Sequence, residues 1–355
     1  MKTIGIICEY NPFHNGHAHQ LHTLAQQYPD TLRICIMSGS FVQRGEPAIF
    51  SKFDRARWAI LGGADIVIEL PTLYSTGSAQ LFGTGAIRMV KALTIDALSF
   101  GSETADLNAL IDIAKRMDCE STQEQLRTYI NEGMSYGTAF RKALHTEILN
   151  TPNALLGLEY IRVGLAYNPK LEYIPILRTS NHHEETITDG LPSGTALRQL
   201  ITSAGDLSSQ CITSTGDLSS KCVTSTGNLA SQLQSAIPSS IASDMTQVIE
   251  NGNYLNYNRY HDMVHSLSRR TTPKELEKFG DFNEGIEHLW SKAAQQFSWT
   301  AATEEIKSKR YTYARLQRMG AYLTLGITKD ILQNAMEEGP QYARLLAFND
   351  RGRQW

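Results

Sequence analysis

The sequence lacks long apolar segments, paired cysteines and an excess of charge of one sign. No apolar run reaches the length of about 18 residues that a membrane-spanning helix needs, and the N-terminus carries no signal-peptide cleavage pattern. The five cysteines are odd in number and too far apart for a zinc site or a CxxC motif, so we expect free, reduced thiols. The net charge of -3 indicates no overall affinity for nucleic acid or a membrane surface. A disulfide-stapled miniprotein is excluded, and we expect a cytoplasmic protein without a membrane partner.

The composition that remains is that of an ordinary globular protein, 41% hydrophobic and 19% charged. In the first half, short β-branched runs alternate with segments of helical periodicity. Strands are predicted over residues 3–9, 32–37, 65–70, 96–100 and 172–177, and helices over 16–27, 52–61, 78–91, 106–116, 153–165 and 194–201. This alternation predicts an α/β fold with a Rossmann-like open parallel sheet, which binds ligands at the carboxyl ends of its strands.

An 11-residue tandem repeat follows, with copies that begin at Ile201, Ile212 and Val223. A glycine in each copy argues against one continuous helix, so we interpret residues 201–233 as an expanded surface insertion. From residue 234 to residue 355 helical patterns dominate, over 273–278, 284–297, 313–325 and 330–336. They predict a smaller α-helical C-terminal domain.

The sharpest motif, Asn11-Pro12-Phe13-His14-Asn15-Gly16-His17, lies where the first predicted strand meets the first predicted helix. Gly16 lets the backbone approach a ligand closely, and the start of the helix offers N–H groups and a positive dipole end to phosphate. His14 and His17 can stabilise charge on an α-phosphate and a departing pyrophosphate. The pattern predicts a nucleotide site. Alternatively, the histidines of this segment, with His19 and His22, form a metal cluster or pack on an amphipathic turn.

A second anion-binding pattern, Ser193-Gly194-Thr195-Ala196-Leu197-Arg198, opens a later helix. The hydroxyls of Ser193 and Thr195, with Arg198 one turn on, suit the β and γ phosphates of a nucleotide. Taken alone, Ser193 could be a plain N-cap and Arg198 a solvated residue. Lys52 and Arg55 share one face of a predicted helix; they could reach nucleotide or RNA, but we interpret this as an ordinary solvated face.

Together the two motifs resemble those of the HxGH nucleotidyltransferase superfamily, in which both segments hold one ATP. Residues 6–17, 37–48, 63–71 and 99–103, and Lys309-Arg310-Tyr311-Thr312, are similar to the tRNA(Met) cytidine acetate ligase family. The resemblance spans nearly the whole chain apart from the repeat. It implies a nucleotidyltransferase-like catalytic domain over residues 1–200, the insertion over 201–233 and a tRNA-binding helical domain over 234–355.

The resemblance implies that ATP and acetate form acetyl-adenylate with release of pyrophosphate. Acetyl then passes to N4 of the wobble cytidine of elongator tRNA(Met), giving N4-acetylcytidine. We expect Mg²⁺ to accompany ATP, no metal ligands on the protein and no obligate protein partner. The implied catalytic residues are His14, His17 and Arg198. The implied ATP-site residues are Ile7, Cys8, Glu9, Tyr10, Asn11, Pro12, Phe13, His14, Asn15, Gly16, His17, Ala18, His19, Gln20, Gly101, Asn153, Arg178, Ser193 and Thr195.

Three of these positions also have a chemical rationale of their own. Gly101 ends a strand where a Cβ would crowd a ligand, the Asn153 amide can read an adenine edge, and the Arg178 guanidinium can bind phosphate. The alternatives are a turn for Gly101, an N-cap for Asn153 and a surface charge for Arg178.

RNA contact is predicted where basic residues cluster with tyrosines near the C-terminus. The residues predicted to bind tRNA are Lys307, Lys309, Arg310, Tyr311, Arg315 and Arg318. Such a patch binds phosphates without reading sequence, and its alternative is a helix whose arginines face water.

Two other functions stay open on the residues. A small-molecule adenylyltransferase of the same superfamily would have no need of this C-terminal cluster, and a non-catalytic RNA-binding module would have no need of the intact HxGH segment.

Overall fold

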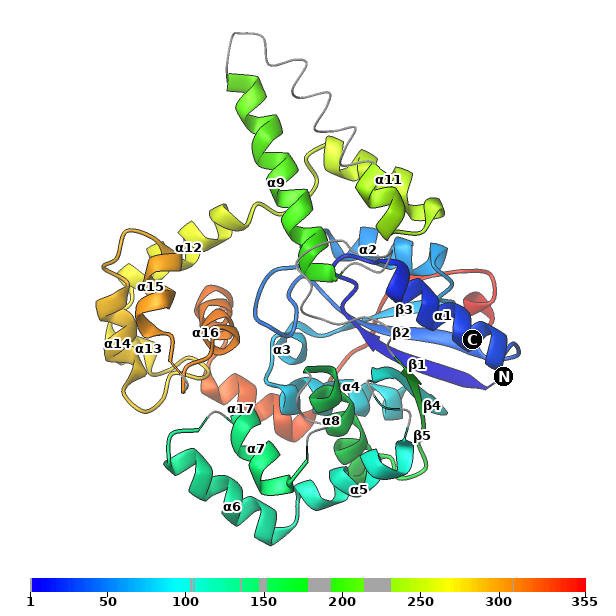
Figure 1. Ribbon diagram of the computed structural model, residues 1–355, viewed down its shortest axis with the longest axis horizontal. Coiled ribbons are helices and arrows are strands. Elements are labelled where there is room, and N and C mark those ends of the chain that lie inside the picture. The colour runs from blue at the N-terminus through cyan, green and yellow to red at the C-terminus, as the bar shows by residue number, and fades with distance from the viewer. Residues whose placement is uncertain are drawn as a thin grey trace.

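A computed structural model describes residues 2–102, 104, 106–134, 136–146, 152–177, 193–213, 231–308 and 310–355. Its centre is one six-stranded sheet in the order β5-β4-β1-β2-β3-β6 (Figure 1). The strands are β1 Thr3–Cys8, β2 Leu32–Ser38, β3 Ile66–Leu70, β4 Ala97–Ser102, β5 Glu172–Leu177 and β6 Arg344–Phe348. All pairs among the first five strands are parallel, and β6 pairs antiparallel with β3. The predicted open α/β sheet is confirmed, and its antiparallel edge strand was not predicted.

Helices cover both faces of this sheet, because successive side chains of a buried strand point to opposite sides. On β2, Ile34 and Ile36 belong to one hydrophobic cluster, and Cys35 and Met37 belong to another. The first cluster includes side chains of α3 Thr72–Ser75, α4 Ala79–Ala92, α5 Leu107–Met117, α6 Glu120–Asn131, α7 Tyr136–Leu144, α8 Pro152–Tyr167 and α17 Lys329–Glu338. The second includes side chains of α1 Asn15–Gln27, α2 Lys52–Leu61, α9 Gly194–Thr213 and α11 Ser239–Glu250.

A separate helical unit, α12 to α16, lies to one side of the sheet (Figure 1). Its helices are α12 Tyr257–Arg270, α13 Pro273–Leu276, α14 Ile286–Ala293, α15 Trp299–Ile306 and α16 Tyr313–Leu325. The unit has its own core, in which the Trp290 ring contacts those of Phe282 and Trp299, at centroid distances of 4.9 and 5.1 Å. The chain before it, in α11, and after it, in α17 and β6, packs on the sheet. The domain limits at residues 200 and 234 stay a prediction.

Helix α9 differs from the expectation for the repeat, because it continues through the first copy to Thr213. The Ser193 hydroxyl accepts a hydrogen bond from the Ala196 N–H at 3.1 Å, and Leu197 and Ile201 are fully buried against the sheet. Capping and packing outweigh the low helix propensity of glycine here. Residues 214–230, most of the second and third copies, lie outside the described residues.

The structure also bears on the cysteines and on membrane-spanning helices. Cys8, Cys35 and Cys119 are free thiols, as predicted, in the part of the chain that is described. Across the same ranges, none of the helices combines the length and apolarity needed to cross a membrane.

Candidate functional site

The two histidines of the first motif form a fixed pair at the start of α1. His14 is the N-cap, and its Nδ1 accepts a hydrogen bond from the Gly16 N–H at 3.1 Å. Nδ1 of His17 accepts from the N–H of His14 at 3.3 Å, and the two rings stack with centroids 3.7 Å apart. Since Nδ1 accepts in each neutral ring, the proton of each lies on Nε2. Two Nε2–H donors at a helix start suit an oxyanion.

Two predicted ATP-site residues lie in the core beneath this pair. Tyr10 and Phe13 are buried, and their rings lie 4.8 and 5.7 Å from the ring of His17. Tyr10 adopts a positive φ of 47°, a conformation that L-residues rarely adopt. Burial raises the pKa of its phenol and of the neighbouring Cys8 thiol, so both stay neutral. These side chains support His17 from the protein interior.

The second motif lies directly against the first. Arg198 donates from Nη1 to the carbonyl of Asn11 at 2.7 Å, and from Nη2 to the hydroxyl of Thr195 at 3.1 Å. A Cβ on Gly194 would lie 3.2 Å from the carbonyl oxygen of Asn11. This distance is shorter than an ordinary van der Waals contact, so the backbone of Asn11 would have to shift. Two patterns 187 residues apart in sequence therefore form one site, and Arg198 is not an ordinary solvated residue.

Of the other predicted ATP-site residues, some lie at or near β4, and others lie outside the residues that the structure describes. Gln20 donates to the hydroxyl of Ser99 on β4 at 3.2 Å, and Gly101 lies near the carboxyl end of that strand. Asn153 is in the first turn of α8, but its side chain and the whole of Arg178 lie outside the described residues. His19 is exposed. Within the described ranges no group of three or more His, Cys, Asp or Glu residues could hold a metal ion, so nothing supports the alternative of a histidine metal cluster.

Arg55 is a site residue whose role the sequence analysis misjudged. Its side chain is fully buried, and its guanidinium donates to four backbone carbonyls. Those acceptors belong to Glu9, Ser38, Gly39 and Phe50. Burial lowers the pKa of Arg55 to about 10, which leaves it charged at neutral pH. Arg55 therefore ties together the segments that follow β1 and β2.

Lys52 is also not a solvated residue. Its ammonium contacts both carboxylate oxygens of the buried Glu69 at 2.8 Å, and Glu69 also pairs with Arg344 at 3.2 Å. The spacing of Arg55 with the apolar Trp58 and Ala59 was the available signal that Arg55 lies on the buried face of α2.

A loop between β2 and α2 joins the site to the helical unit. The Glu46 carboxylate accepts a hydrogen bond from the amide of Gln317 on α16, and the Tyr257 hydroxyl donates to the carbonyl of Pro47 at 3.3 Å. Gly45 has a φ of +85°, and a Cβ there would lie 2.4 Å from the backbone of Arg318. Only glycine fits this contact without a shift of the backbone. The loop is therefore packed against α16.

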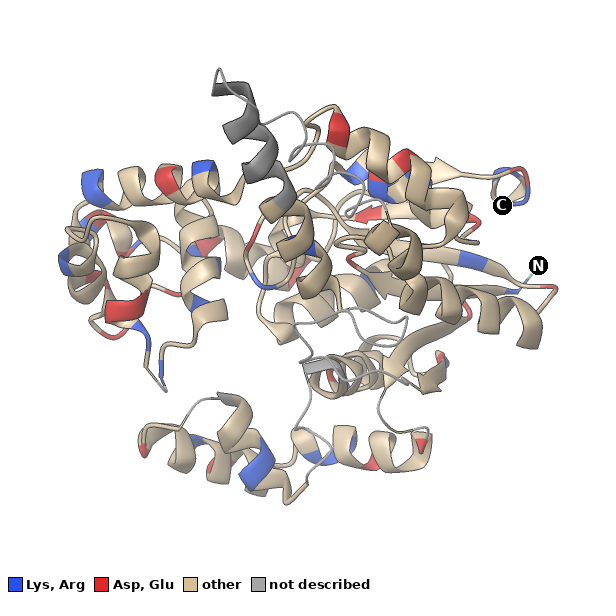
Figure 2. Ribbon diagram, turned by 45° about the horizontal axis from the view of Figure 1, so that its top comes forward, with Lys and Arg blue, Asp and Glu red and all other residues tan. Residues whose placement is uncertain are grey.

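The predicted tRNA-binding residues that the structure describes lie on the helical unit, where Figure 2 shows basic and acidic residues interspersed. Arg310 pairs with Glu284 at 2.7 Å and Arg318 with Asp281 at 3.6 Å. The Arg315 guanidinium donates to the carbonyl of Asp281 at 3.1 Å. The ring of Tyr311 lies near both Arg310 and Arg315, with each guanidinium carbon within 6 Å of its centroid. Lys307 is exposed, and Lys309 lies outside the described residues.

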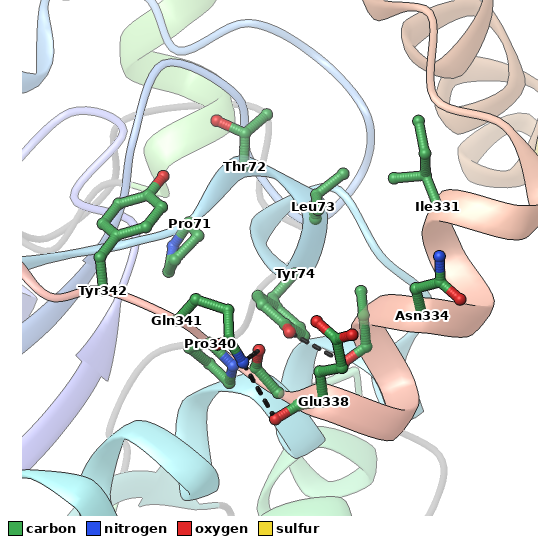
Figure 3. Close-up of a pocket in the computed structure, with 12 residues that line it drawn as sticks. Pro71, Thr72, Leu73, Tyr74, Ile331, Asn334, Glu338, Pro340, Gln341 and Tyr342 are labelled. Carbon is green, nitrogen blue, oxygen red and sulfur yellow. Dashed lines mark hydrogen bonds between the residues drawn. The ribbon is translucent and has the colours of Figure 1, made fainter.

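A cavity of about 340 Å³ opens elsewhere, between α3, α17 and the segment before β6 (Figure 3). Tyr74 lines it and donates from its hydroxyl to the carbonyl of Ala335 at 2.8 Å. Its lining includes none of the predicted ATP-site residues that the structure describes, so this cavity is distinct from the histidine site.

Comparison with known proteins supports the nucleotidyltransferase interpretation of the motifs at His14 and Ser193. The family described as HIGH nucleotidyl transferase matches residues 1–355. The tRNA(Met) cytidine acetate ligase of Alkaliphilus metalliredigens is 33% identical, over 100% of this chain and 84% of the relative. The chain belongs to this ligase family. The enzyme of the same name from Acetivibrio thermocellus is 32% identical, with the same coverage. The resemblance and the assignment as a ligase are confirmed.

Solved structures of the family confirm the fold. The apo crystal structure of Thermotoga maritima TmcAL superposes with a TM-score of 0.89 at 27% identity, over 100% of this chain and 82% of that chain. A second structure of the same protein, bound with alpha-thio ATP, gives a TM-score of 0.86 at 28% identity, with the same coverage. The roles of individual residues in the present chain stay predictions.

Proposed function

We propose that this protein is an ATP-dependent acetate ligase that acetylates N4 of the wobble cytidine of elongator tRNA(Met), giving N4-acetylcytidine. The contact between Arg198 and Asn11 carries the proposal, because it joins two anion-binding motifs into one site at the carboxyl end of β1. The names of the relatives support the choice of tRNA(Met) and acetate as substrates, and the alpha-thio ATP in the Thermotoga maritima protein supports ATP.

In the first step, the proposed ATP site holds the triphosphate in place for an in-line attack. An acetate oxygen attacks the α-phosphorus, the bond to the bridging oxygen breaks, and pyrophosphate leaves with the electron pair. His14, His17 and Arg198 donate to the oxygens on which charge develops, and Ser193 and Thr195 add hydroxyl donors. The product is acetyl-adenylate, and no covalent intermediate on the protein is required.

The rest of the ATP site is assigned by the same proposal. Residues 7–20 line one side of the nucleotide, with Gly101, Asn153 and Arg178 as further contacts. Mg²⁺ is included as the companion of the triphosphate. Since the described residues hold no cluster of three or more metal-binding side chains, we assign it no protein ligands and derive no step from it.

The second step brings tRNA to the helical unit. Lys307, Lys309, Arg310, Arg315 and Arg318 are proposed to contact phosphates, with Tyr311 as a stacking group. Catalysis is assigned to residues 1–200 and tRNA binding to residues 234–355, with residues 201–233 as an insertion without a catalytic role. The cytoplasm is the proposed place of action.

Pyrophosphate exchange tests this function. Purified protein is incubated with ATP, labelled pyrophosphate and acetate, with and without unmodified elongator tRNA(Met). We expect exchange that requires acetate, and labelled acetyl on the tRNA. Exchange or ATP turnover that is indifferent to acetate and tRNA would instead support a small-molecule adenylyltransferase. Failure to bind ATP at all would support a non-catalytic RNA-binding module.

A further inference from the structure

The proposed second step needs a group that accepts a proton. N4 of cytidine attacks the carbonyl carbon of the acetyl group, and the bond from that carbon to the phosphate oxygen breaks. AMP leaves with the electron pair, and one proton of the amine has to leave N4. A carboxylate within reach of the amine is a suitable acceptor.

We infer that Glu46 is the general base for acetyl transfer, an inference that rests on the proposed function. Glu46 lies where the ATP site and the helical unit meet. Its carboxylate contacts Gln317 of α16, two residues beyond Arg315 of the predicted tRNA-binding cluster. The same loop reaches the ATP site at Ile49, whose N–H donates to the side-chain oxygen of Asn11 at 2.8 Å.

The packing of the loop fixes this position. Gly45 lies against the backbone of α16 at Arg318, and the Val42 N–H donates to the carbonyl of Glu46 at 2.9 Å. An adenylate held at the start of α1 and an RNA held on α16 therefore approach each other across this loop. Glu46 is the loop's acidic residue, half-buried at that junction.

Other carboxylates near the strand ends either form ion pairs or belong to the proposed ATP site, so they are less suitable as the base. Glu69 is held by Lys52 and Arg344, and Asp65 pairs with Arg33 at 3.0 Å. Glu9 accepts from the N–H of Gln43 at 2.8 Å and belongs to the proposed ATP site. Glu46 accepts a hydrogen bond from the neutral amide of Gln317. Its carboxylate keeps the acceptor capacity that a base requires.

The surroundings of Glu46 favour this chemistry. Burial raises the pKa of Glu46, while the charges of Arg198 and Arg44 and the hydrogen bond from Gln317 act in the opposite direction. Glu9 adds to the increase in the Glu46 pKa. Burial and the charge of Glu46 both raise the pKa of the nearby phenols of Tyr257, Tyr260 and Tyr313. A carboxylate with a raised pKa is a stronger base toward an amine proton.

Glu46→Gln tests the inference, because the amide keeps an acceptor oxygen for Gln317 but cannot take up a proton. Acetate-dependent pyrophosphate exchange and single-turnover acetyl transfer to tRNA are measured on the same preparation. We expect the ratio of transfer to exchange to fall by about 10²–10⁴-fold. In the wild type, the transfer rate falls at low pH as a carboxylate is protonated, and this limb is absent from the profile of the variant.

Glu172→Gln on β5 is the matched control, because it removes an exposed carboxylate that pairs with Lys2 far from the junction, and it leaves both rates unchanged. Unchanged transfer in Glu46→Gln overturns the inference. Equal losses of exchange and transfer also overturn it, because they indicate a structural role. If the variant does not fold, Glu46→Asp replaces it, since it keeps the carboxylate but withdraws it by one methylene; losses of exchange and transfer that are equal in this variant overturn the inference. Absence of exchange in the wild type overturns the proposed function itself, a result distinct from these.

Discussion

Replacing Arg55 with methionine tests whether this buried arginine holds the site together. The change keeps much of the apolar stem of the side chain and removes the guanidinium. Four backbone carbonyls then lose a donor. A buried acceptor without a partner costs about 1–3 kcal/mol, so four of them set an upper range of about 4–12 kcal/mol. Burial of the guanidinium is itself unfavourable, so its removal offsets part of that cost. We expect a net loss of about 3–5 kcal/mol in the free energy of unfolding, because the four unpaired carbonyls outweigh the gain from removing a buried charge.

Urea unfolding, followed by circular dichroism, measures this loss. Arg55→Lys is the matched control, because an ammonium keeps the charge and three donors, and it should lie between the wild type and the methionine variant. ATP binding should weaken in Arg55→Met as well, because Glu9, one of the four acceptors, belongs to the proposed ATP loop. A free energy of unfolding within about 1 kcal/mol of the wild type would refute the reasoning, since it would mean that water or other donors satisfy these carbonyls.

Three further predictions concern the site, the sheet and the repeat. His17→Ala should abolish acetate-dependent pyrophosphate exchange and leave tRNA binding nearly intact in a filter assay; loss of tRNA binding would contradict the division of roles. Asp65 is buried, which would raise its pKa, but hydrogen bonds from Arg33 and Asn349 prevail and hold the pKa below that of an ordinary aspartate. Asp65→Asn should therefore lower the free energy of unfolding by about 1–3 kcal/mol at neutral pH, and the difference should shrink as acid protonates the wild-type carboxylate; a difference independent of pH would be inconsistent with this. Deletion of residues 204–225, two repeat periods, should leave pyrophosphate exchange intact, and an inactive but folded deletion variant would show that the repeat is required.

Elements with a clear apolar face were predicted from the sequence with accurate limits. Helices α2 and α16 have the predicted bounds, because their buried positions follow the helical period. Strand β5 also has the predicted bounds, although none of its residues is fully buried. Strand β6 was missed because it is largely exposed and follows a long segment in which helical patterns dominate. Leu345 and Phe348, for example, are each about half exposed. A pattern that depends on burial is weak in such a strand.

The candidate site was predictable as far as its chemistry is local. Phosphate-binding groups at two helix starts predicted that the two motifs belong to one site, and the structure shows Arg198 in contact with the carbonyl of Asn11 in the first motif. Contacts between residues that are distant in sequence could not be predicted from such local patterns. The hydrogen bond between Glu46 and Gln317 joins residues 271 apart in sequence, and nothing in the sequence near Glu46 indicates it. The spacing of Arg55 indicates the buried face of α2, but it could not show that backbone carbonyls satisfy the charge of the guanidinium.

The antiparallel edge strand has a consequence for how the chain reaches its folded state. Glu69 on β3 pairs with Arg344 on β6, 275 residues later in the sequence, and the whole helical unit is synthesised after β3 and before β6. Closing so long a loop is slow compared with forming the local βαβ units. During synthesis on the ribosome, β3 therefore stands as an unpaired edge, with the apolar run Ile66, Val67 and Ile68, until the later strand arrives. An exposed apolar edge of this kind pairs readily with other chains, so the interval before β6 docks is when a nascent chain is most prone to aggregate and most in need of a chaperone.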